Sequence, residues 1–293
     1  MKAQLGILAD LPHACRYITF RLRPGGDPCD GLRTLAQQSW GDRLVVGIGA
    51  SLVAATGGHI PGLKTFSAQV GPSGIVVPST PEALWCWLRG HDRGSLLHAG
   101  RDLERLLGET FAIRSVVDGF KHEGGRDLSG YEDGTENPQG DKALQVALVP
   151  EGGVGGAGAS FVAVQQWVHD FAALDRCSPS ERDRIVGRRR SDNKELDDAP
   201  PSAHVVRTAQ ESFSPEAFLL RRSAPWADAT RAGLMFVAFS HSFAAFETQL
   251  QHMLGHDDGI VDGLFRFTRP ITGSYFWCPP CLDGYLDLTA LDI

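Results

Sequence analysis

A short acidic segment, SGYEDGTENPQG over residues 129–140, combines the residue types that hold a catalytic carboxylate in a fixed direction. Glycine lets the backbone take positive φ and approach a ligand closely, and Pro138 fixes the exit from the loop. A carboxylate at Asp133 would then have a set orientation and a shifted pKa, which suits acid–base chemistry. The same letters are also typical of an Asx-type turn with surface acids, and spacing alone leaves both interpretations open.

A second candidate for chemistry is CPPC, from Cys278 to Cys281. A CxxC motif can be a redox pair or half of a zinc site. The sequence has no second CxxC to complete a zinc site, and no strand–CxxC–helix pattern surrounds this one. The other four cysteines are scattered along a chain too long to need disulfide staples. We therefore interpret the pair as structural thiols.

The composition excludes several classes of protein. The 293 residues are 42% hydrophobic and 22% charged, which is ordinary for a globular protein with one or two full-sized cores. A net charge of −7 and a pI of about 5.8 argue against nucleic acid or an anionic membrane as a partner. No apolar run reaches the roughly 18–20 residues of a membrane helix, and the N-terminal letters lack the apolar core of a secretory signal. We expect a cytoplasmic protein.

Strands and helices alternate along the sequence. Strands are predicted where β-branched and aromatic residues cluster, at 16–22, 43–49, 111–120, 160–168, 216–222 and 234–240. A helix is predicted over 178–187, because Ser178, Pro179 and Glu181 form a capping box and Gly187 ends it. A second helix is predicted over 242–255 from apolar residues at helical spacing.

Two segments look like copies of one unit. LVVGIGASLVA, residues 44–54, lines up with MFVAFSHSFAA, residues 235–245, and each reads as strand, small-residue turn and helix start. The glycine-rich residues 151–160 lie between them and read as a linker. The order of elements fits an α+β fold of two similar halves, with a boundary between 1–150 and 151–293.

The segment GYEDGTENP resembles the GxxDG motif of the dye-decolorising peroxidases, a family of haem enzymes. Further blocks resemble the same family in the same order, from about residue 4 to 280, with a length similar to the compact bacterial B-type branch. These blocks are QLGILADLPHACRYITFRL, VGRRRSDNKELDD, SAHVVR, FLLRRSAPW and FRFTRPITGSYFWCPP.

The resemblance implies two ferredoxin-like halves with antiparallel sheets and one haem b per chain between them. Residues 1–150 would carry the GxxDG motif, and residues 151–293 would carry the histidine that binds iron and a distal arginine. The suspected duplication agrees with this arrangement.

The resemblance places His204 as the proximal ligand of the haem iron. Ten histidines compete for this role, and on physical grounds His169 and His241 are the nearest rivals. A lone histidine is more often a hydrogen-bonded core residue than a ligand. Asp262 lies where the family often has an aspartate and is the candidate partner for the second nitrogen of His204, with an exposed turn residue as the alternative.

On the distal side, the resemblance implies that Asp133 moves a proton between the two oxygens of hydrogen peroxide. Arg221 would stabilise the negative charge that develops as the O–O bond stretches. Arg222 follows directly, but neighbouring residues of a strand point to opposite faces, so one of the two faces the haem. Many relatives have Asn two residues after this arginine, where this chain has Ser223, and this departure puts the turnover rate in doubt.

Other residues are expected along the haem edge. Gly134, Thr135, Glu136 and Asn137 follow Asp133 directly, and Glu136 could also help to bind a metal cation. Arg188 is a candidate partner for a haem propionate, although a cation near a helix C-terminus is the equally weighted alternative. Trp277 and Tyr275 could relay electrons to bulky substrates that cannot reach the haem, but core packing is the default interpretation for each.

The resemblance implies a peroxidase that reduces hydrogen peroxide and oxidises dyes, phenols or other one-electron donors. A non-catalytic haem carrier or sensor, a haem iron-releasing protein and a ferredoxin-like module without haem are the alternatives. Family members commonly form homo-oligomers, and some dock into encapsulin shells through a C-terminal tail. For the tail here, CLDGYLDLTALDI, a strand that completes the core or an oligomer contact is the competing interpretation.

Overall fold

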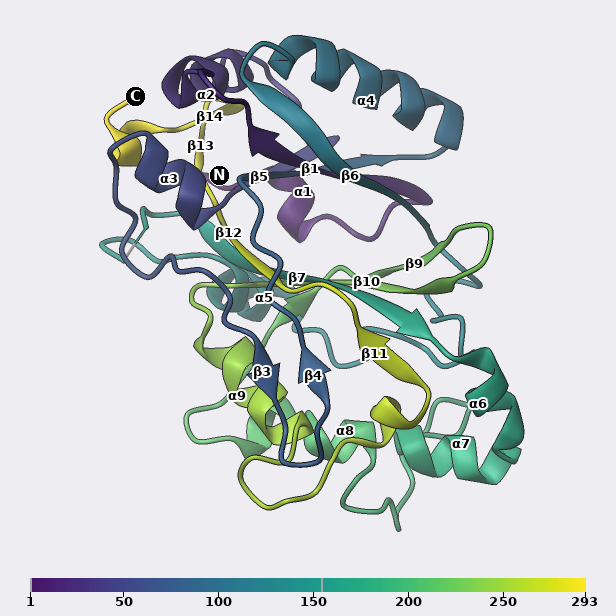
Figure 1. Cartoon of the computed structure of the whole chain (residues 1–293). Coiled ribbons are helices and arrows are strands. Elements are labelled where there is room, and N and C mark those ends of the chain that lie inside the picture. Colours follow the sequence, from purple (N-terminus) through teal and green to yellow (C-terminus); the bar gives the residue numbers. More distant parts are fainter. Residues whose placement is uncertain (1, 154) are drawn as a thin grey trace.

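The first half of the chain folds as a four-stranded antiparallel sheet with the ferredoxin-like order of strands. The computed structural model describes residues 2–153 and 155–293, and Figure 1 shows this sheet in its upper part. Its strands run in the order β2-β5-β1-β6, so the first strand lies between the third and the fourth. The bounds are β1 (Ala14–Leu22), β2 (Leu44–Ile48), β5 (Leu84–Gly90) and β6 (Phe111–Phe120), with helices α2 (Pro28–Ala36) and α4 (Arg93–Leu107) on the outer face.

The second half repeats this order. Its first strand, β7, pairs with its third, β10, and with its last, β12, while β8 and β9 together occupy the second position beside β10. A short strand, β11, pairs with the remaining end of β7. The bounds are β7 (Ser160–His169), β8 (Leu220–Arg221), β9 (Ala224–Ala227), β10 (Ala232–Ser240), β11 (Thr268–Pro270) and β12 (Ser274–Cys278). The predicted α+β fold of two ferredoxin-like halves is confirmed.

The edges of the two sheets pair with each other and close a ring. Trp277 of β12 pairs with Ile48 of β2, and Gly119 of β6 pairs with Trp226 of β9. Each pairing joins the last strand of one half to the second strand of the other. The inside of the ring is filled with buried side chains, among them Tyr17, Trp85, Trp87, Val237, Phe239 and Phe276.

Alternation along the strands separates this inner core from an outer one. On β5, Trp85 and Trp87 point into the ring, whereas Leu84, Cys86 and Leu88 belong to the outer core under the helices. Both faces of β5 are therefore covered, and six of its seven residues are buried. Because aromatic side chains fill the space between the sheets, that space has no room for a haem, and the site has to lie elsewhere.

The remaining elements are connections and coverings. A predicted helix is confirmed as α7, where Ser178 and Glu181 form the capping box and Gly187 has φ 90°. None of the described helices is long and apolar enough to cross a bilayer. The helices and turns are α1 (Leu5–Leu8), α3 (Ala50–Ala55), α5 (Gly140–Ala147), α6 (Phe171–Arg176), α7 (Pro179–Val186), α8 (His204–Arg207), α9 (Ala244–Met253), η1 (Gln210–Ser212), η2 (Gly263–Arg266) and η3 (Thr289–Leu291); the short strands are β3 (Gln69–Val70), β4 (Val76–Val77), β13 (Cys281–Leu282) and β14 (Tyr285–Leu286).

The duplication is present, but the pairing predicted for it was wrong. Residues 44–54 contain β2, the second strand of its half, whereas residues 235–245 contain β10, the third strand of the other half. The true counterpart of β10 and α9 is β5 followed by α4. The two aligned segments share a pattern because a buried strand leading into a helix recurs at several positions of this fold.

The C-terminal tail packs onto the first half. Strands β13 and β14 form a hairpin, and Leu288 and Leu291 are buried in the outer core. The two thiols of CPPC are free in this structure. Burial raises the pKa of Cys278 and also that of Cys281, to about 11, so both are protonated at neutral pH, in agreement with structural thiols.

Candidate active site

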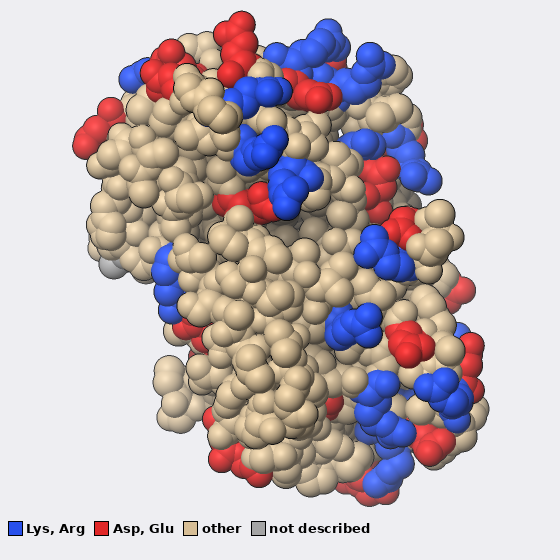
Figure 2. All heavy atoms as spheres, in the orientation of Figure 1, with Lys and Arg blue, Asp and Glu red and all other residues tan. Residues whose placement is uncertain are grey.

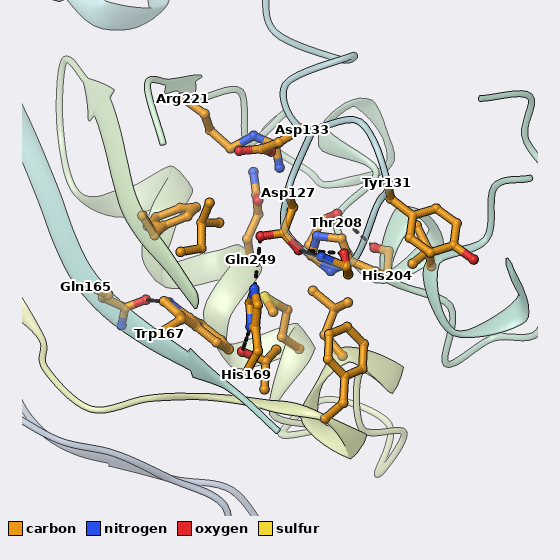
Figure 3. A pocket seen from close by; sticks show the side chains of 18 of the residues that line it. Asp127, Tyr131, Asp133, Gln165, Trp167, His169, His204, Thr208, Arg221 and Gln249 are labelled. Carbon is orange, nitrogen blue, oxygen red and sulfur yellow. Dashed lines mark hydrogen bonds and ion pairs between the residues drawn. The ribbon is translucent and has the colours of Figure 1, made fainter. Parts of the chain in front are cut away.

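The main cavity lies on the outer face of the second sheet and holds about 920 Å³ of space free of protein atoms, part of it open to solvent. Its floor comes from β7 and β10, its sides from α9 and η2, and the loop with the GxxDG motif closes it (Figure 3). The resemblance implied a haem between the two halves. The cavity lies between them only in the sense that a loop of the first half covers the sheet of the second. Much of the lining is apolar: Trp167, Val186, Leu234, Phe236, Phe246, Leu250, Met253, Leu264 and Phe267.

His204 begins α8 and lines this cavity. Its Nδ1 lies 2.7 Å from Oδ2 of Asp262, whose side chain is fully buried. The other carboxylate oxygen of Asp262 accepts a hydrogen bond from the backbone N–H of Leu264, which fixes the carboxylate. Among the described residues, His204 has no hydrogen-bond partner at Nε2. The geometry matches the arrangement in which an imidazole binds a metal through one nitrogen while a carboxylate orients the other.

Asp133 and Arg221 meet at the upper edge of the cavity in the view of Figure 3. Oδ1 of Asp133 lies 3.7 Å from Nη2 of Arg221, and the two side chains are 24% and 20% exposed. Arg222 points to the other face of the strand, where its guanidinium donates to the backbone carbonyl of Leu8. The structure therefore brings Arg221, and not Arg222, together with Asp133.

Asn137 holds Arg221 in place through the backbone. Its Oδ1 accepts from the N–H of Arg221 at 2.8 Å, and its Nδ2 donates to the carbonyl of Arg221 at 3.0 Å. Gly134 has φ 77°, and a Cβ there would lie 2.7 Å from Nδ2 of Asn137. Asn137 thus acts as a bridge between the GxxDG loop and β8 and does not lie along the cavity wall.

Replacing Asn137 by Ala should loosen the contact between the acid and the arginine. The two backbone groups of Arg221 would lose their partners, at a cost of about 1–3 kcal/mol in the free energy of unfolding. Because small displacements of catalytic groups are costly, the rate of reaction with peroxide should fall about 10- to 100-fold. Thermal unfolding and stopped-flow spectroscopy measure the two effects. Gln139→Ala, an exposed change in the same loop, is the control and should change neither; a rate for Asn137→Ala equal to that of the control would contradict the prediction.

The guanidinium of Arg188 already has carboxylate partners within the chain, so it is not free to bind a ligand. Its Nη2 lies 2.6 Å from Oε1 of Glu136 and 2.5 Å from Oε1 of Glu195, and its Nη1 donates to the carbonyl of Asn193. It lines a second, more polar cavity that shares His204, Asp133 and Arg221 with the first. An added propionate would have to compete with two carboxylates for this guanidinium.

The other residues expected at the haem edge are placed as follows. Thr135 and Glu136 line the second cavity, and Oγ1 of Thr135 accepts from Nδ2 of Asn193. Ser223 lies between β8 and β9 and belongs to neither cavity lining, and its hydroxyl accepts from the N–H of Val237 at 3.4 Å. The described residues contain no cluster of three metal-ligating side chains, and the carboxylate of Glu136 is paired with Arg188.

Tyr275 and Trp277, the relay candidates, are core residues. Tyr275 is 4% exposed and stacks on Phe243, and Trp277 is fully buried with its Nε1 donating to the carbonyl of Gly155. Neither belongs to the lining of the main cavity.

A buried pair that the sequence analysis missed lies in the cavity wall. Nε2 of His169 is 2.9 Å from Oδ1 of Asp127, and Nδ1 of His169 is 2.7 Å from Oγ1 of Thr268 (Figure 3). Burial acts to raise the pKa of the Asp127 carboxyl, but hydrogen bonds from His169 and Ser129 outweigh it and lower the pKa. The pair ties the GxxDG loop to the end of β7. Both ring nitrogens of His169 thus have hydrogen-bond partners. Neither is free to bind the haem iron, the role for which His169 was a rival of His204.

Asp127→Asn should destabilise the fold at neutral pH, by about 1–3 kcal/mol, because it removes a charged acceptor from buried donors. The pKa of Asp127 is lowered on folding, so its stabilising contribution is present above the ordinary value of 3.8 and is lost as the pH falls below it. The difference in unfolding free energy between wild type and variant should therefore shrink below about pH 4. Urea unfolding at pH 7 and pH 3.5 tests this, with the exposed Asp197→Asn as control. A gap that stays constant with pH would contradict the role of a charged Asp127 as the acceptor of these hydrogen bonds.

Comparison with known proteins decides the family. Residues 124–283, more than half of the chain, match the family model described as "Dyp-type peroxidase, C-terminal". The chain belongs to the Dyp-type peroxidase family. A dye-decolorizing peroxidase of Mycobacterium tuberculosis is 29% identical over 223 residues, which cover 74% of this chain and 66% of that relative.

Solved Dyp-type structures share the whole fold. A putative Dyp-type peroxidase from Shewanella oneidensis superposes with a TM-score of 0.89 at 26% identity, covering 100% of this chain and 98% of the other. A DypB variant from Rhodococcus jostii RHA1 in complex with heme gives a TM-score of 0.83 at 26% identity, covering 93% and 94%. These matches agree with the B-type branch that the sequence resembles.

The residues present fit a haem. A haem needs apolar walls for its macrocycle, one nitrogen ligand for its iron and polar groups at an open edge. The main cavity offers the apolar walls, His204 offers Nε2, and the second, polar cavity opens beside it.

Proposed function

We propose that this chain is a haem-dependent peroxidase, which reduces hydrogen peroxide and oxidises dyes, phenols or other one-electron donors. The observation that carries the proposal is that His204, Asp133 and Arg221 line one apolar cavity, with His204 oriented by Asp262. We assign one haem b per chain, with His204 as the proximal ligand. Bound haem would supply an iron centre that accepts oxidising equivalents from peroxide and passes them to donors.

The side chains of the cavity have distinct roles in this reaction. Asp133 takes a proton from one oxygen of hydrogen peroxide and delivers it to the other, which leaves as water. The guanidinium of Arg221, at 3.7 Å from Asp133, stabilises negative charge on the departing oxygen. Asp133 thus acts first as a base and then as an acid. Apolar neighbours such as Phe236 and Phe246 exclude water and strengthen both interactions.

Asp262 and Asn137 act through other residues. Asp262 accepts the Nδ1–H of His204 and raises the electron density at Nε2, which strengthens its bond to a metal. Asn137 positions the backbone of Arg221. Ser223, where many relatives have Asn, lines neither cavity in this chain, so we assign the positioning of peroxide to Asp133 and Arg221.

Addition of one equivalent of hydrogen peroxide to the haem-loaded protein tests the function. A carrier or sensor needs only His204, whereas a peroxidase also uses Asp133 and Arg221. We expect a five-coordinate ferric spectrum whose Soret band changes within the mixing time of seconds and recovers when a phenol is added. A six-coordinate spectrum that does not respond to peroxide would favour the carrier or sensor. Absence of a Soret band after haem addition would exclude both.

We further propose that the protein acts in the cytoplasm as a homo-oligomer. The six cysteines are all free thiols, which is typical of cytoplasmic proteins. Members of the family commonly form homo-oligomers. Docking of the tail into an encapsulin shell would require release of Leu288 and Leu291 from the core, which argues against it.

A further inference from the structure

The helix that carries His204 is one turn long. Helix α8 has four residues, and so short a helix is not stable by itself in water, so its orientation depends on contacts with other elements. Its start is tied to the segment 254–263, which follows α9, because the backbone N–H of Gly263 donates to the carbonyl of Ser202 at 2.7 Å. Nδ1 of His204 faces Asp262 in the same segment. The contacts at the far end of α8 therefore decide how the imidazole is held against this segment.

Arg207 holds that far end. Its Nη1 donates to Oδ2 of Asp258 at 2.7 Å and its Nη2 donates to Oδ1 at 3.0 Å, which is the bidentate geometry of two parallel hydrogen bonds. Nη2 also donates to the carbonyl of His252 in the last turn of α9, beside which α8 lies in Figure 1. Arg207 lies one turn after His204, and Asp258 lies four residues before Asp262. The two pairs thus join the same two segments.

Arg207 is a buried cation. Figure 2 shows Lys and Arg side chains interspersed with Asp and Glu on the surface of the face that it presents. The side chain of Arg207, in contrast, is 2% exposed, and its Nε–H has no hydrogen-bond partner among the described residues. A buried ion pair is often no more stabilising than apolar side chains of the same volume, because both charges lose their hydration. Unlike an apolar contact, a bidentate pair fixes one relative orientation of the elements that it joins.

Asp258 is itself fixed within the segment that leads to Asp262. Its Oδ1 accepts from the backbone N–H of Ile260 at 2.9 Å. Hydrogen bonds from Arg207 and from this N–H lower the pKa of Asp258 to about 2, so the carboxylate is charged at neutral pH. Neither Arg207 nor Asp258 lines the main cavity or the second cavity. Any effect of the pair on a bound group must therefore pass through another residue.

We propose that the Arg207–Asp258 pair positions His204 against Asp262 and thereby sets how strongly the imidazole binds the haem iron. Without the pair, the remaining hydrogen bonds described between α8 and the facing segment would all lie near the start of the helix. Nδ1 of His204 would then move more freely relative to Oδ2 of Asp262. A weaker hydrogen bond at Nδ1 leaves less electron density at Nε2, so the bond to the iron weakens. This inference rests on the proposed function, because it takes His204 as the haem ligand.

Resonance Raman spectroscopy of the haem-loaded protein in the ferrous state tests this role, since the iron–histidine stretching band reports the strength of that bond. Arg207→Met keeps an unbranched apolar side chain but removes the bidentate donor. Asp258→Asn is the milder variant, at a side chain that is 36% exposed, and decides the test alone if Arg207→Met does not fold. We expect the band to shift to lower frequency in both, in the direction of Asp262→Asn. A band at the wild-type frequency in Asp258→Asn would overturn the proposal.

The rate of haem release to an excess of apomyoglobin gives a second measure. Loss of a direct partner costs a metal-bound histidine about 10- to 100-fold in affinity or activity, so Arg207→Met, which acts one residue further away, should speed release about three- to tenfold. Release at the wild-type rate in this variant would contradict the positioning role. If the wild type itself lacks the iron–histidine band, the assignment of His204 as ligand fails. A band that is present but unshifted in the variants refutes the positioning role alone.

Arg16→Met is the matched control for both measurements. Nη1 of Arg16 lies 3.1 Å from Oδ1 of Asp118, and the two side chains are 16% and 26% exposed, so this is also a partly buried ion pair. It joins β1 to β6, and neither residue lines a cavity that contains His204. The control should change neither the band nor the release rate. Equal shifts in Arg16→Met and Arg207→Met would mean that general destabilisation, and not positioning, moves the band.

Discussion

Arg221→Leu and Asp133→Asn should each leave haem bound but slow the reaction with hydrogen peroxide, by about 10²- to 10³-fold and about 10²- to 10⁴-fold respectively. Arg221→Leu removes the charge that stabilises the departing oxygen. Asp133→Asn removes the group that moves the proton. Stopped-flow spectroscopy at the Soret band measures the rate constant, and the haem-to-protein ratio confirms that both variants are loaded.

The two side chains should also act as a unit. Because Nη2 of Arg221 lies 3.7 Å from Asp133, the double variant should lose less than the product of the two single effects. Arg222→Lys is the control, since that residue contacts the carbonyl of Leu8 on the other face of the strand and should leave the rate constant unchanged. Unchanged rates in both single variants would contradict the assignment of the catalytic pair.

His204→Ala should lose most of its haem. Loss of a carboxylate partner alone typically costs a metal-bound histidine about 10- to 100-fold in affinity or activity, so loss of the ligand itself should cost more than about 100-fold. Haem titration followed at the Soret band measures the affinity. Added imidazole should fill the space left in His204→Gly and restore part of the spectrum.

His252 provides a matched control for this change. Its side chain has the same exposed fraction as that of His204, 22%, and its Nδ1 also faces a carboxylate, but it lines only the second cavity. His252→Ala should weaken haem binding far less than His204→Ala does. A His204→Ala protein that binds haem as tightly as His252→Ala would exclude His204 as the ligand, and a loss of haem in His169→Gln instead would point to the rival histidine.

Most residues of the candidate site were predicted from the resemblance to the family, and few from the spacing of residues along the sequence. His204 and Asp262 are separated by 58 residues, and Asp133 and Arg221 by 88, so no local pattern reveals that they meet. Alternation of side chains along a strand was a better guide, because it correctly predicted that Arg221 and Arg222 point to opposite faces. The bonds of Asn137 to the backbone of Arg221 have no sequence signal, since an amide can bind to any exposed N–H and C=O.

The elements that were missed have physical reasons of their own. LWCWLRG, residues 84–90, gave no alternating pattern because both faces of β5 are buried. His169 did carry a signal, because it follows Gln165 and Trp167 at spacing two on β7 and so shares their face toward the cavity. Its partner Asp127 did not, since that contact depends on how the loop returns over the sheet. Of the predicted strand 216–222, only Leu220–Arg221 forms, because the backbone N–H groups of Ala217 and Leu219 bond to Gln210 and not to a neighbouring strand.

The closed ring of strands bears on how such a protein could arise. The last strand of each half pairs with the second strand of the other, which is the self-complementary contact of a symmetric dimer. Two identical copies of an ancestral half would close the same ring, with each copy covering the other's sheet edges and aromatic face. In the present chain the outer faces of the two halves differ. The first half has helices packed against its sheet, and the second has a cavity there, while the shared core inside the ring stays buried.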